Sequence, residues 1–408
     1  MGLQLCQLCE IAYFVTDKIP LENVLLTDYV TTDSLLPNKE GRCVAQNLPP
    51  QKCALTHYKC GDVLVANIRP YLKKIWFADR EGGASADVLV FRAKSGHSQE
   101  FLYASLLQDT FYDYVMKGKK GSKMPRGDRD QIMRYSIPKL SLAEEACIGN
   151  MILSFCTKIN VSRRINDNLE AMAKQLYDYW FVQFDFPNEE GKPYKSSGGA
   201  MVYNEKLKRE IPQGWTAAKI KDVAQTYSGG TPTSTNSEYY DGGNIPWINS
   251  GELNNSIITS TTNYITEEGL KNSSAKLYPQ DTILVALYGA TDGKVSLLSF
   301  EACSNQAVCG VIPPNKIMTT YIRYYLFSLY EHFITLSSGS ARDNISQETI
   351  KNTILPIPQE KILKEYSDAV APIISKTIAN QKEMENLTKQ RDELLPLLLN
   401  GQASVNSD

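Results

Sequence analysis

Histidine is scarce in this chain, with three residues in 408, at positions 57, 97 and 332. The sequence also lacks the Gly-x-Ser-x-Gly element that presents a nucleophilic serine, so a hydrolytic triad has no support. Residues 289–295 come nearest to a phosphate-binding P-loop, but the loop is one residue short and ends in valine instead of serine or threonine. The Asn/Asp-Pro-Pro-aromatic site of a base-modifying methyltransferase is absent. We therefore expect no catalytic centre in this chain.

Long apolar runs and a strong excess of one charge are also missing. No stretch approaches the roughly 18 apolar residues that a membrane span needs, and residues 1–19 lack a basic region followed by an apolar core. Lys and Arg number 43 against 45 Asp and Glu, so any phosphate-binding surface must be local. The nine cysteines are odd in number and scattered, unlike a disulfide framework. We expect a cytoplasmic protein with reduced thiols and no metal site.

An internal repeat organises the chain. Gly121-Ser122 corresponds to Gly339-Ser340 and Pro138 to Pro356, both at an offset of 218 residues, and the register continues without a gap as far as Leu176 and Leu394. Two copies are too few and too long for a solenoid, so duplication of a domain plus a helix is the simplest interpretation. Short apolar runs predict strands, and aromatic-rich patches at residues 100–116 and 320–336 predict helices. Each copy therefore begins with a mixed α/β domain; the predicted strands are residues 63–66, 87–91, 282–286 and 307–312.

A long helical pattern follows each domain, after Pro138 and Pro358. Its apolar positions alternate steps of three and four, which is the heptad pattern of a coiled coil. Polar residues in the middle of both seams cost stability but fix register and partner. The alternative is two amphipathic helices, each packed on its own domain. The seam positions are Ile152, Phe155, Ile159, Ser162, Asn166, Leu169, Ala173, Leu176 and Trp180 in the first helix, and Val370, Ile373, Thr377, Asn380, Met384, Leu387, Arg391, Leu394 and Leu398 in the second.

Helices of this length would act as a spacer. About 40 residues at 1.5 Å per residue give roughly 60 Å. Antiparallel pairing would hold the two domains at opposite ends, related by a pseudo-twofold axis. Half-sites one DNA turn apart lie about 34 to 36 Å from centre to centre, a separation that such a spacer can set. The predicted fold class is mixed, or α+β, with two α/β domains separated by two long antiparallel coiled-coil helices.

One local run of positive charge stands out. Residues 117–134 carry seven basic and two acidic residues, and their glycines and proline favour a loop that can approach phosphates. Arg69, Lys73 and Lys74 form a second basic patch after the first strand. A solvated loop without a partner is the alternative. The corresponding loop of the second copy, residues 337–344, is polar but far less charged, so the two copies would read different partners or sequences with the same geometry.

The second copy carries a set of recognisable motifs: Ile211-Pro-Gln-Gly-Trp215, Tyr227-Ser-Gly-Gly-Thr231-Pro232, Ile245-Pro-Trp-Ile248, Leu287-Tyr-Gly-Ala-Thr291 and Asn305-Gln-Ala307. Together these motifs resemble the specificity subunits of type I restriction-modification systems. The stretch 179–199 is similar to that family's junction between the central helix and the second recognition domain, and residues 391–401 are similar to its closing helix. One departure is Asp292, which stands where the family usually has an apolar residue. The resemblance covers about residues 130–401, because residues 1–120 match only through order and repeat.

The resemblance implies two target-recognition domains, each reading one half of a bipartite double-stranded DNA target. It implies helices that set the gap and bind two methyltransferase subunits, which recruit restriction and translocase subunits. It also implies a non-catalytic chain, with S-adenosylmethionine, ATP and Mg²⁺ in the partner subunits. The corresponding boundaries are 1–140 for the first recognition domain, 141–186 for the central helix, 187–210 for a linker, 211–356 for the second recognition domain, 357–400 for the C-terminal helix and 401–408 for a tail.

The expected site residues fall into two groups. Phosphate contacts position a protein on DNA, and a few side chains at base edges specify the sequence. The helix-pairing residues are Ile152, Phe155, Ile159, Asn166, Leu169, Leu176, Ile373, Asn380, Leu387 and Leu394. The expected DNA-binding residues are Arg69, Lys73, Lys74, Lys117, Lys119, Lys120, Lys123 and Arg126 in the first domain, and Gly230, Thr231, Asn249, Tyr288, Thr291, Lys294, Arg342 and Asn344 in the second.

Two other classes of protein stay open at this point. A stand-alone DNA-binding module with a duplicated fold would bind a specific sequence without partners. A nuclease using Asp185, Glu190 and Lys192 would cleave DNA in the presence of Mg²⁺.

Overall fold

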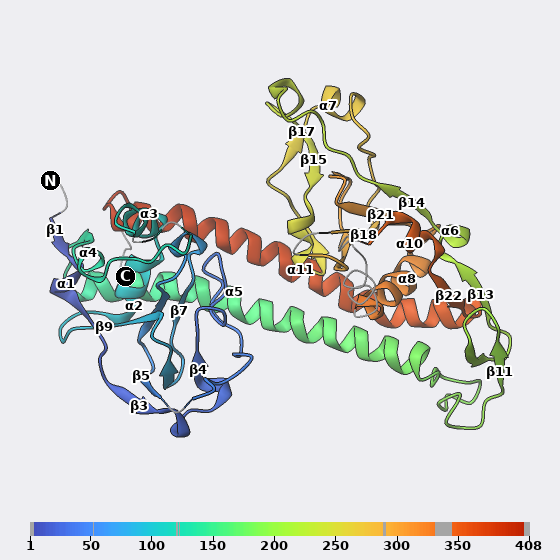
Figure 1. Cartoon of the computed structure of the whole chain (residues 1–408), viewed down its shortest axis with the longest axis horizontal. Helices are drawn as coiled ribbons and strands as arrows, with labels where there is room; N and C mark the ends of the chain where they lie inside the picture. The colour runs from blue at the N-terminus through green and yellow to red at the C-terminus, as the bar shows by residue number, and fades with distance from the viewer. Residues whose placement is uncertain are drawn as a thin grey trace. The chain divides into compact units, whose positions relative to one another are not determined.

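The computed structural model describes residues 4–51, 53–119, 121, 123–288, 291–330 and 345–403. The chain forms two compact units: Met1–Ser162 with Met384–Asp408 make up unit 1, and Arg163–Glu383 make up unit 2. Two long helices, α5 (Leu142–Tyr177) and α11 (Glu360–Leu399), contribute to both units (Figure 1). The division into compact units therefore falls within both helices, which the sequence had presented as segments of their own. The predicted mixed fold with two α/β domains and two long helices is confirmed.

Unit 1 is built on a four-stranded antiparallel sheet. Its elements are β1 (Leu5–Gln7), α1 (Leu8–Ile11), β2 (Ala12–Phe14), β3 (Lys18–Pro20), β4 (Tyr29–Val30), β5 (Ala54–Tyr58), β6 (Val63–Ala66), β7 (Ile75–Phe77), β8 (Gly82–Ala84), β9 (Val88–Ala93), α2 (Gln99–Leu107), α3 (Asp109–Lys117), α4 (Arg129–Ile132) and β10 (Ser136–Pro138). The order of the main sheet is β2-β9-β6-β7, and a second sheet has the order β3-β5-β8-β4. Strand β6 is buried along its whole length because both faces of the main sheet are covered.

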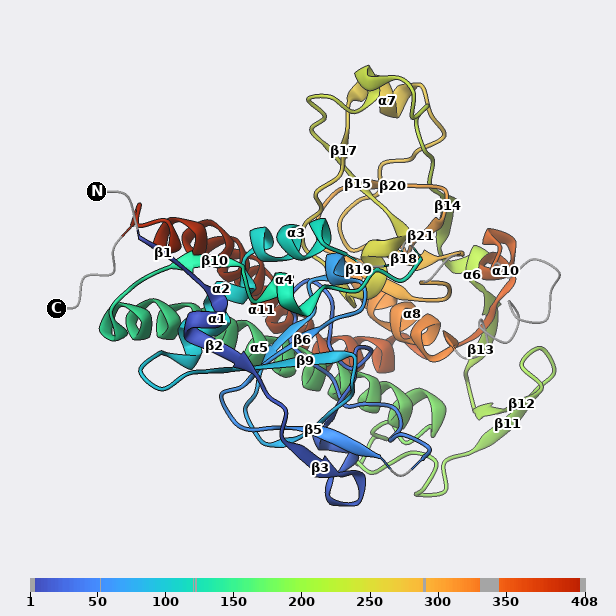
Figure 2. The same ribbon diagram turned by 60° about the vertical axis from the view of Figure 1, so that its left-hand side comes forward.

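Unit 2 repeats this plan. Its elements are β11 (Met201–Asn204), β12 (Arg209–Pro212), β13 (Thr216–Lys219), α6 (Ile220–Val223), β14 (Gln225–Ser228), β15 (Ile245–Ile248), β16 (Ile257–Ile258), β17 (Tyr264–Ile265), α7 (Glu267–Lys271), β18 (Ile283–Ala286), β19 (Val295–Leu298), β20 (Cys303–Ser304), β21 (Val308–Ile312), α8 (Lys316–Ser328), α10 (Gln347–Asn352) and β22 (Ile354–Ile357). The main sheet has the order β14-β21-β18-β19-β16, so its first four strands correspond one by one to β2-β9-β6-β7. The smaller sheet, β17-β15-β20, is drawn with α7 in Figure 2.

The predicted helical patch at residues 100–116 is broken in two. Gln108 has an extended conformation (φ −65°, ψ 145°) and ends α2, while Asp109 begins α3. The carboxylate of Asp109 forms ion pairs with Lys39 at 2.8 Å and Lys73 at 3.0 Å, so the new helix start is fixed by contacts with distant loops. Periodicity within the patch carried no sign of these contacts.

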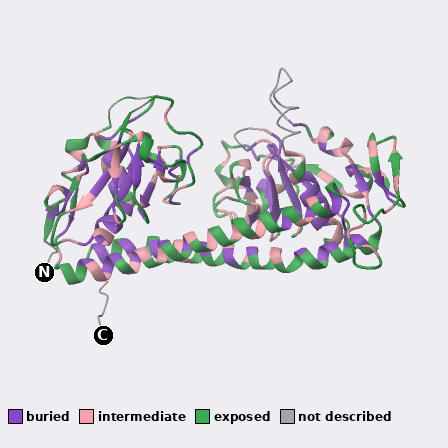
Figure 3. Cartoon of the chain, turned by 90° about the horizontal axis from the view of Figure 1, so that it is seen from below, coloured by how far each residue is buried: buried purple, intermediate pink, exposed green. Residues whose placement is uncertain are grey.

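Helices α5 and α11 run antiparallel and bond directly to each other within each unit. In unit 2, Asn166 Nδ2 donates to the carbonyl of Thr377 at 3.3 Å, and Asn380 Nδ2 donates to Asn166 Oδ1 at 3.0 Å. In unit 1, the guanidinium of Arg391 on α11 lies 3.9 Å from the Cys156 sulfur on α5. Buried residues recur along each helix (Figure 3). These contacts exclude the alternative in which each helix packs only on its own domain.

The seam positions differ in how deeply they are buried. Ile152, Ile159 and Asn380 are buried, and Asn380 is only 3% exposed. The others named as helix-pairing residues are half-buried, and at three of these positions the next residue, Cys156, Tyr177 or Leu395, is the more buried one. Those in the half-buried group are Phe155, Asn166, Leu169, Leu176, Ile373, Leu387 and Leu394.

The helices and the cysteines agree with two of the expectations drawn from composition. Among the helices of the described residues, none combines the length and apolar character that crossing a membrane requires. The nine cysteines all lie in described segments and are free thiols.

The asparagine pair predicts a specific pattern of coupling. We expect Asn166→Leu or Asn380→Leu alone to cost about 1 to 3 kcal/mol of unfolding free energy, because the first leaves the buried Asn380 amide without its acceptor and the second leaves the half-buried Asn166 carbonyl without its donor. The double variant should cost less than the sum of the two single variants. Urea unfolding followed by circular dichroism on all four chains measures this coupling. Strictly additive costs would show that the two amides do not act as a pair.

Candidate nucleic-acid interface

Two loops that carry expected DNA-binding residues occupy equivalent places in the two units. In unit 1, residues 67–74 connect β6 to β7, and in unit 2, residues 287–294 connect β18 to β19. Both pairs of strands are antiparallel neighbours at the same position in the main sheet. The duplication therefore presents one hairpin loop per unit, with different residues on each.

The loop of unit 1 is held in a strained conformation. Arg69 (φ 51°, ψ 61°) and Lys73 (φ 51°, ψ 47°) are both left-handed, on either side of a 3₁₀ turn at Pro70–Leu72. A left-handed residue other than glycine costs roughly 1 to 2 kcal/mol. The backbone N–H of Arg69 donates to the Pro125 carbonyl at 2.9 Å, and Ile68 forms an isolated bridge with Arg126. These bonds hold the loop in place and bring the two predicted basic patches together.

Some of the expected basic contacts are already used inside unit 1. Lys73 pairs with Asp109 at 3.0 Å, and Arg126 pairs with Asp87 at 3.0 Å. Lys74 donates to the Thr32 carbonyl at 2.5 Å, and burial lowers the pKa of its ammonium. These three side chains stabilise the local fold. Their charged groups already contact other groups of the protein and are therefore less available to a ligand.

Four other basic side chains are exposed. Arg69, Lys117, Lys119 and Lys123 form no salt bridge with any residue in the described part of the chain. Lys120, also expected to contact DNA, lies outside the described residues. The arrangement leaves an exposed cationic surface, which we call the unit 1 basic surface, made of Arg69, Lys117, Lys119 and Lys123. Such a surface suits a polyanion, because the charges are not neutralised within the protein.

In unit 2, the equivalent loop is held by its own polar side chains. Thr291 is buried and donates its hydroxyl to the Ser250 carbonyl at 2.9 Å. Lys294 Nζ lies 2.5 Å from Asn254 Oδ1, and Tyr288 is half-buried against the core. Thr291 and Lys294 therefore shape the loop. Arg342 and Asn344, the remaining expected contacts of this region, lie outside the described residues.

A polar cluster adjoins this loop at the ends of β15 and β20. Asn305 Nδ2 donates to Asn249 Oδ1 at 3.1 Å, and the exposed Thr231 hydroxyl donates to the Gln306 side chain. Trp247 Nε1 donates to the Gly230 carbonyl at 3.0 Å. Side-chain amides can bond base edges, so Asn305 and Gln306 belong with the candidate surface although the sequence analysis did not select them. The motif Asn305-Gln-Ala307 was the signal available for them.

Gly230 has a structural role. A Cβ at this position would lie 2.3 Å from the backbone nitrogen of Ala275, so no other residue fits the close approach of the two segments. Its carbonyl orients Trp247, and its own surface is buried. Of the expected unit 2 residues, Thr231 and Asn249 therefore lie together with Asn305 and Gln306. Gly230 allows the close approach of two backbone segments.

The residues considered for a nuclease make other contacts. Asp185 accepts hydrogen bonds from the Ser196 hydroxyl at 2.6 Å and the Ser196 backbone at 2.7 Å, which lower the pKa of its carboxyl. Glu190 and Lys192 form an exposed ion pair with each other at 2.9 Å. Within the described ranges, no group of three or more His, Cys, Asp and Glu side chains is placed to hold a metal ion.

Comparison with known proteins finds similarity to one family. Residues 212–389 match the model described as the type I restriction modification DNA specificity domain. The chain is 26% identical to the type I restriction enzyme HindI specificity subunit of Haemophilus influenzae, over 92% of this chain and 94% of that protein. It is 27% identical to the MjaIX specificity subunit of Methanocaldococcus jannaschii, over 76% of this chain and 71% of that protein.

A solved structure shares the fold. The type I restriction-modification S subunit from M. genitalium has a TM-score of 0.57 at 13% identity, over 98% of this chain and 96% of that one. This likeness concerns the fold alone. The family model and the relatives confirm the resemblance drawn from the sequence.

The strain at Arg69 predicts the effect of a substitution on stability. Arg69→Gly should leave the unfolding free energy unchanged or raise it by up to about 1 kcal/mol, since glycine removes the left-handed penalty but loses more backbone entropy on folding. Arg69→Ala keeps the penalty and is the matched control. Thermal unfolding of the three chains measures the difference. A glycine variant less stable than the alanine variant would show that the loop is not strained at this residue.

Proposed function

We propose that this chain is a specificity subunit of the type I restriction-modification family and reads a bipartite double-stranded DNA target with one domain per half-site. The observation that carries the proposal is the duplicated hairpin loop. Two copies of one sheet present loops at the same position, and these loops carry different side chains. A protein that recognises two different half-sites needs loops in the same position on each domain, with different side chains to contact each half-site.

The charge pattern supports binding to DNA in unit 1. The unit 1 basic surface lies on a chain whose net charge is −2, so its attraction for phosphates is local. In unit 2, the exposed Thr231 and the amides of Asn249, Asn305 and Gln306 supply hydrogen-bond donors and acceptors of the kind that read base edges. The proposal assigns phosphate contacts mainly to unit 1 and a larger share of base contacts to this cluster in unit 2.

The long helices supply the surface for partner subunits in this proposal. In unit 2, Ile165 and Met172 are exposed apolar side chains seven residues apart, so they lie on one side of α5. Exposed apolar patches of this kind are typical of faces that a partner covers. We propose two methyltransferase subunits as the partners, with restriction and translocase subunits joining through them.

In this proposal, the chain itself catalyses no reaction. Recognition and scaffolding are its tasks, and S-adenosylmethionine, ATP and Mg²⁺ serve the partner subunits. The complex would work in the cytoplasm, where its DNA target lies.

The methylation pattern of cellular DNA tests the proposal as a whole. Cells that express this chain with its methyltransferase should carry a methylated motif of two short half-sites separated by a gap of fixed length, and the motif should disappear when this chain is removed. Sequencing that detects modified bases measures the pattern. An active methyltransferase whose pattern does not depend on this chain would favour the stand-alone DNA-binding module.

The salt dependence of DNA affinity tests the unit 1 basic surface. Lys119→Ala with Lys123→Ala should weaken binding to all sequences and reduce the slope of log affinity against log salt by about 0.9 for each phosphate that is no longer neutralised. The chain is measured in complex with the methyltransferase at several salt concentrations. Lys361→Ala with Lys389→Ala, on the exposed side of α11, is the control with the same change in charge. An unchanged slope in the test variant would remove this surface from the interface.

A further inference from the structure

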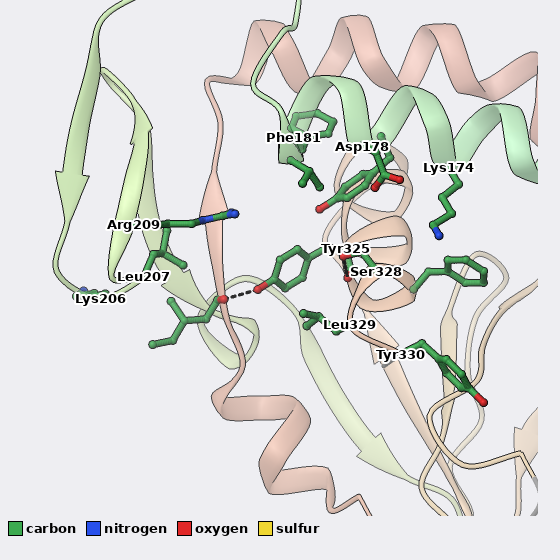
Figure 4. A pocket seen from close by; sticks show the side chains of 14 residues that line it. Lys174, Asp178, Phe181, Lys206, Leu207, Arg209, Tyr325, Ser328, Leu329 and Tyr330 are labelled. Carbon is green, nitrogen blue, oxygen red and sulfur yellow. Dashed lines mark hydrogen bonds between the residues drawn. The ribbon is translucent and has the colours of Figure 1, made fainter. Parts of the chain in front are cut away.

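Unit 2 contains an open pocket of about 770 Å³ away from the residues assigned to DNA (Figure 4). Its walls come from the end of α5, the β11–β12 hairpin and the end of α8. Helix α5 continues there as a π-helical turn, Asp178–Val182, a rare element that is frequent at functional sites. The pocket is therefore built where three elements end, beside an unusual turn of backbone.

Positive charge dominates the pocket. Lys174, Lys206 and Arg209 line it against one acidic residue, Asp178, and these three cations form no salt bridge within the described segments. Lys174 Nζ lies 5.9 Å from the centre of the Phe327 ring, and the guanidinium of Arg209 lies 5.3 Å from the Phe184 ring. Aromatic faces hold these cations in place but leave their hydrogen-bond donors available.

The remaining walls are largely apolar and aromatic. Phe181, Leu207, Tyr325 and Leu329 line the pocket, and Tyr325 donates its hydroxyl to the Ile354 carbonyl at 2.5 Å. A cavity with apolar walls and a few charged groups suits a ligand that carries both apolar surface and negative charge.

In unit 1, ion pairs connect a domain helix to a long helix at the place that corresponds to the pocket. We call this connection the joint. At the 218-residue offset, Lys174 corresponds to Asp392, and Phe327 corresponds to Asp109. In unit 1 the ammonium of Lys39 lies 2.8 Å from Asp109 and 3.7 Å from Asp392, and the Lys39 side chain is 7% exposed. A loop of unit 1 itself thus inserts a lysine between a domain helix and a long helix, and ties them together.

The pKa of Asp109 agrees with this closed joint. Burial opposes ionisation of its carboxyl, but hydrogen bonds from Lys39 and Lys73 outweigh that effect and lower its pKa. The acid is therefore charged in the folded unit, and the joint is an ion pair between protein side chains.

The charges at the unit 2 joint have the opposite sign. Here a lysine stands on the long helix and two more cations come from the hairpin and its strand. Asp178 is the one acidic residue among the lining residues, and within the described part of the chain it forms no ion pair with these cations. By analogy with unit 1, the missing element is an inserted carboxylate. From this comparison we propose that the pocket receives an acidic segment of a partner protein, and that the partner is the methyltransferase subunit of the proposed complex.

This inference rests on the proposed function, since it takes the methyltransferase as the partner. A protein segment is favoured over a nucleic acid because the equivalent joint in unit 1 is made by one side chain inserted between two protein helices, and because Phe181, Leu207 and Leu329 offer apolar contacts beside the cations. The segment would carry Asp or Glu for Lys174 and Lys206 and an apolar side chain for the walls.

Charge reversal in the pocket tests the inference. Lys174→Glu with Lys206→Glu should weaken the affinity of the chain for the methyltransferase subunit by about 10- to 100-fold, because two attractive pairs become repulsive. Both lysines are exposed, so we expect the thermal unfolding of the variant to match that of the parent chain. Lys271→Glu with Lys276→Glu, outside the pocket, is the control with the same charge change and should assemble normally.

A second measurement identifies the occupant. A photocrosslinking amino acid at Leu207 should form a crosslink with an acid-rich segment of the methyltransferase, and replacing the acids of that segment by lysine should restore assembly with the charge-reversed chain.

The outcomes separate this inference from the proposed function. If the parent chain does not bind the methyltransferase, the proposed function fails and this inference fails with it. If the parent chain binds and the charge-reversed chain binds equally well, this inference alone is overturned. It is also overturned if the variant assembles normally but binds DNA with a reduced salt slope, which would assign the pocket to DNA phosphates.

Discussion

Asn166 and Asn380 form the contact on which the rest of unit 2 depends. Both amides lie in a seam whose other members are mostly apolar, and each is satisfied by the other or by the Thr377 carbonyl. Sliding one helix by a turn would separate the two amides and break the hydrogen bond between Asn380 and Asn166. The pair therefore favours one register of α5 against α11. Every element of unit 2 that packs on both helices inherits its position from that register.

Each unit has a buried arginine at the helix pair, but in unit 2 the arginine comes from a domain helix and in unit 1 from a long helix. In unit 2, Arg323 on α8 reaches the long helix and pairs with Glu170 at 2.9 Å. In unit 1, the position equivalent to Arg323 is Ser105, and Arg391 on α11 instead lies buried beside Cys156. A guanidinium stays charged when buried, so each joint needs acceptors supplied by its neighbours. The duplicated domains thus share a topology while their joints have diverged.

The parts of this architecture that follow local rules could be predicted from the sequence. The buried strands β6 and β18 read as short apolar runs, and the seam of α5 and α11 reads as steps of three and four. The break at Gln108 could not be predicted, because it depends on Lys39 and Lys73, which come from distant loops. The same limit applied to the site. Residue type suggested Thr291 and Lys294 as ligand contacts, but their bonds to Ser250 and Asn254 exist only once β18, β19 and the preceding loop are packed together.

Some side chains of the candidate interface hold the fold, and others are exposed without an ion pair among the described residues. This difference determines which positions can change when such a protein changes its DNA target. Lys74 and Thr291 hold their loops through bonds to backbone carbonyls, so replacing them would disturb the scaffold. Arg69 and Lys119 are exposed and form no ion pair among the described residues, so replacing them would cost the fold little. The loops of the candidate interface can then acquire a new binding preference at the second kind of position while the first kind keeps the geometry constant. Because the two kinds alternate within a few residues, a change of target requires neither a new sheet nor a new helix register.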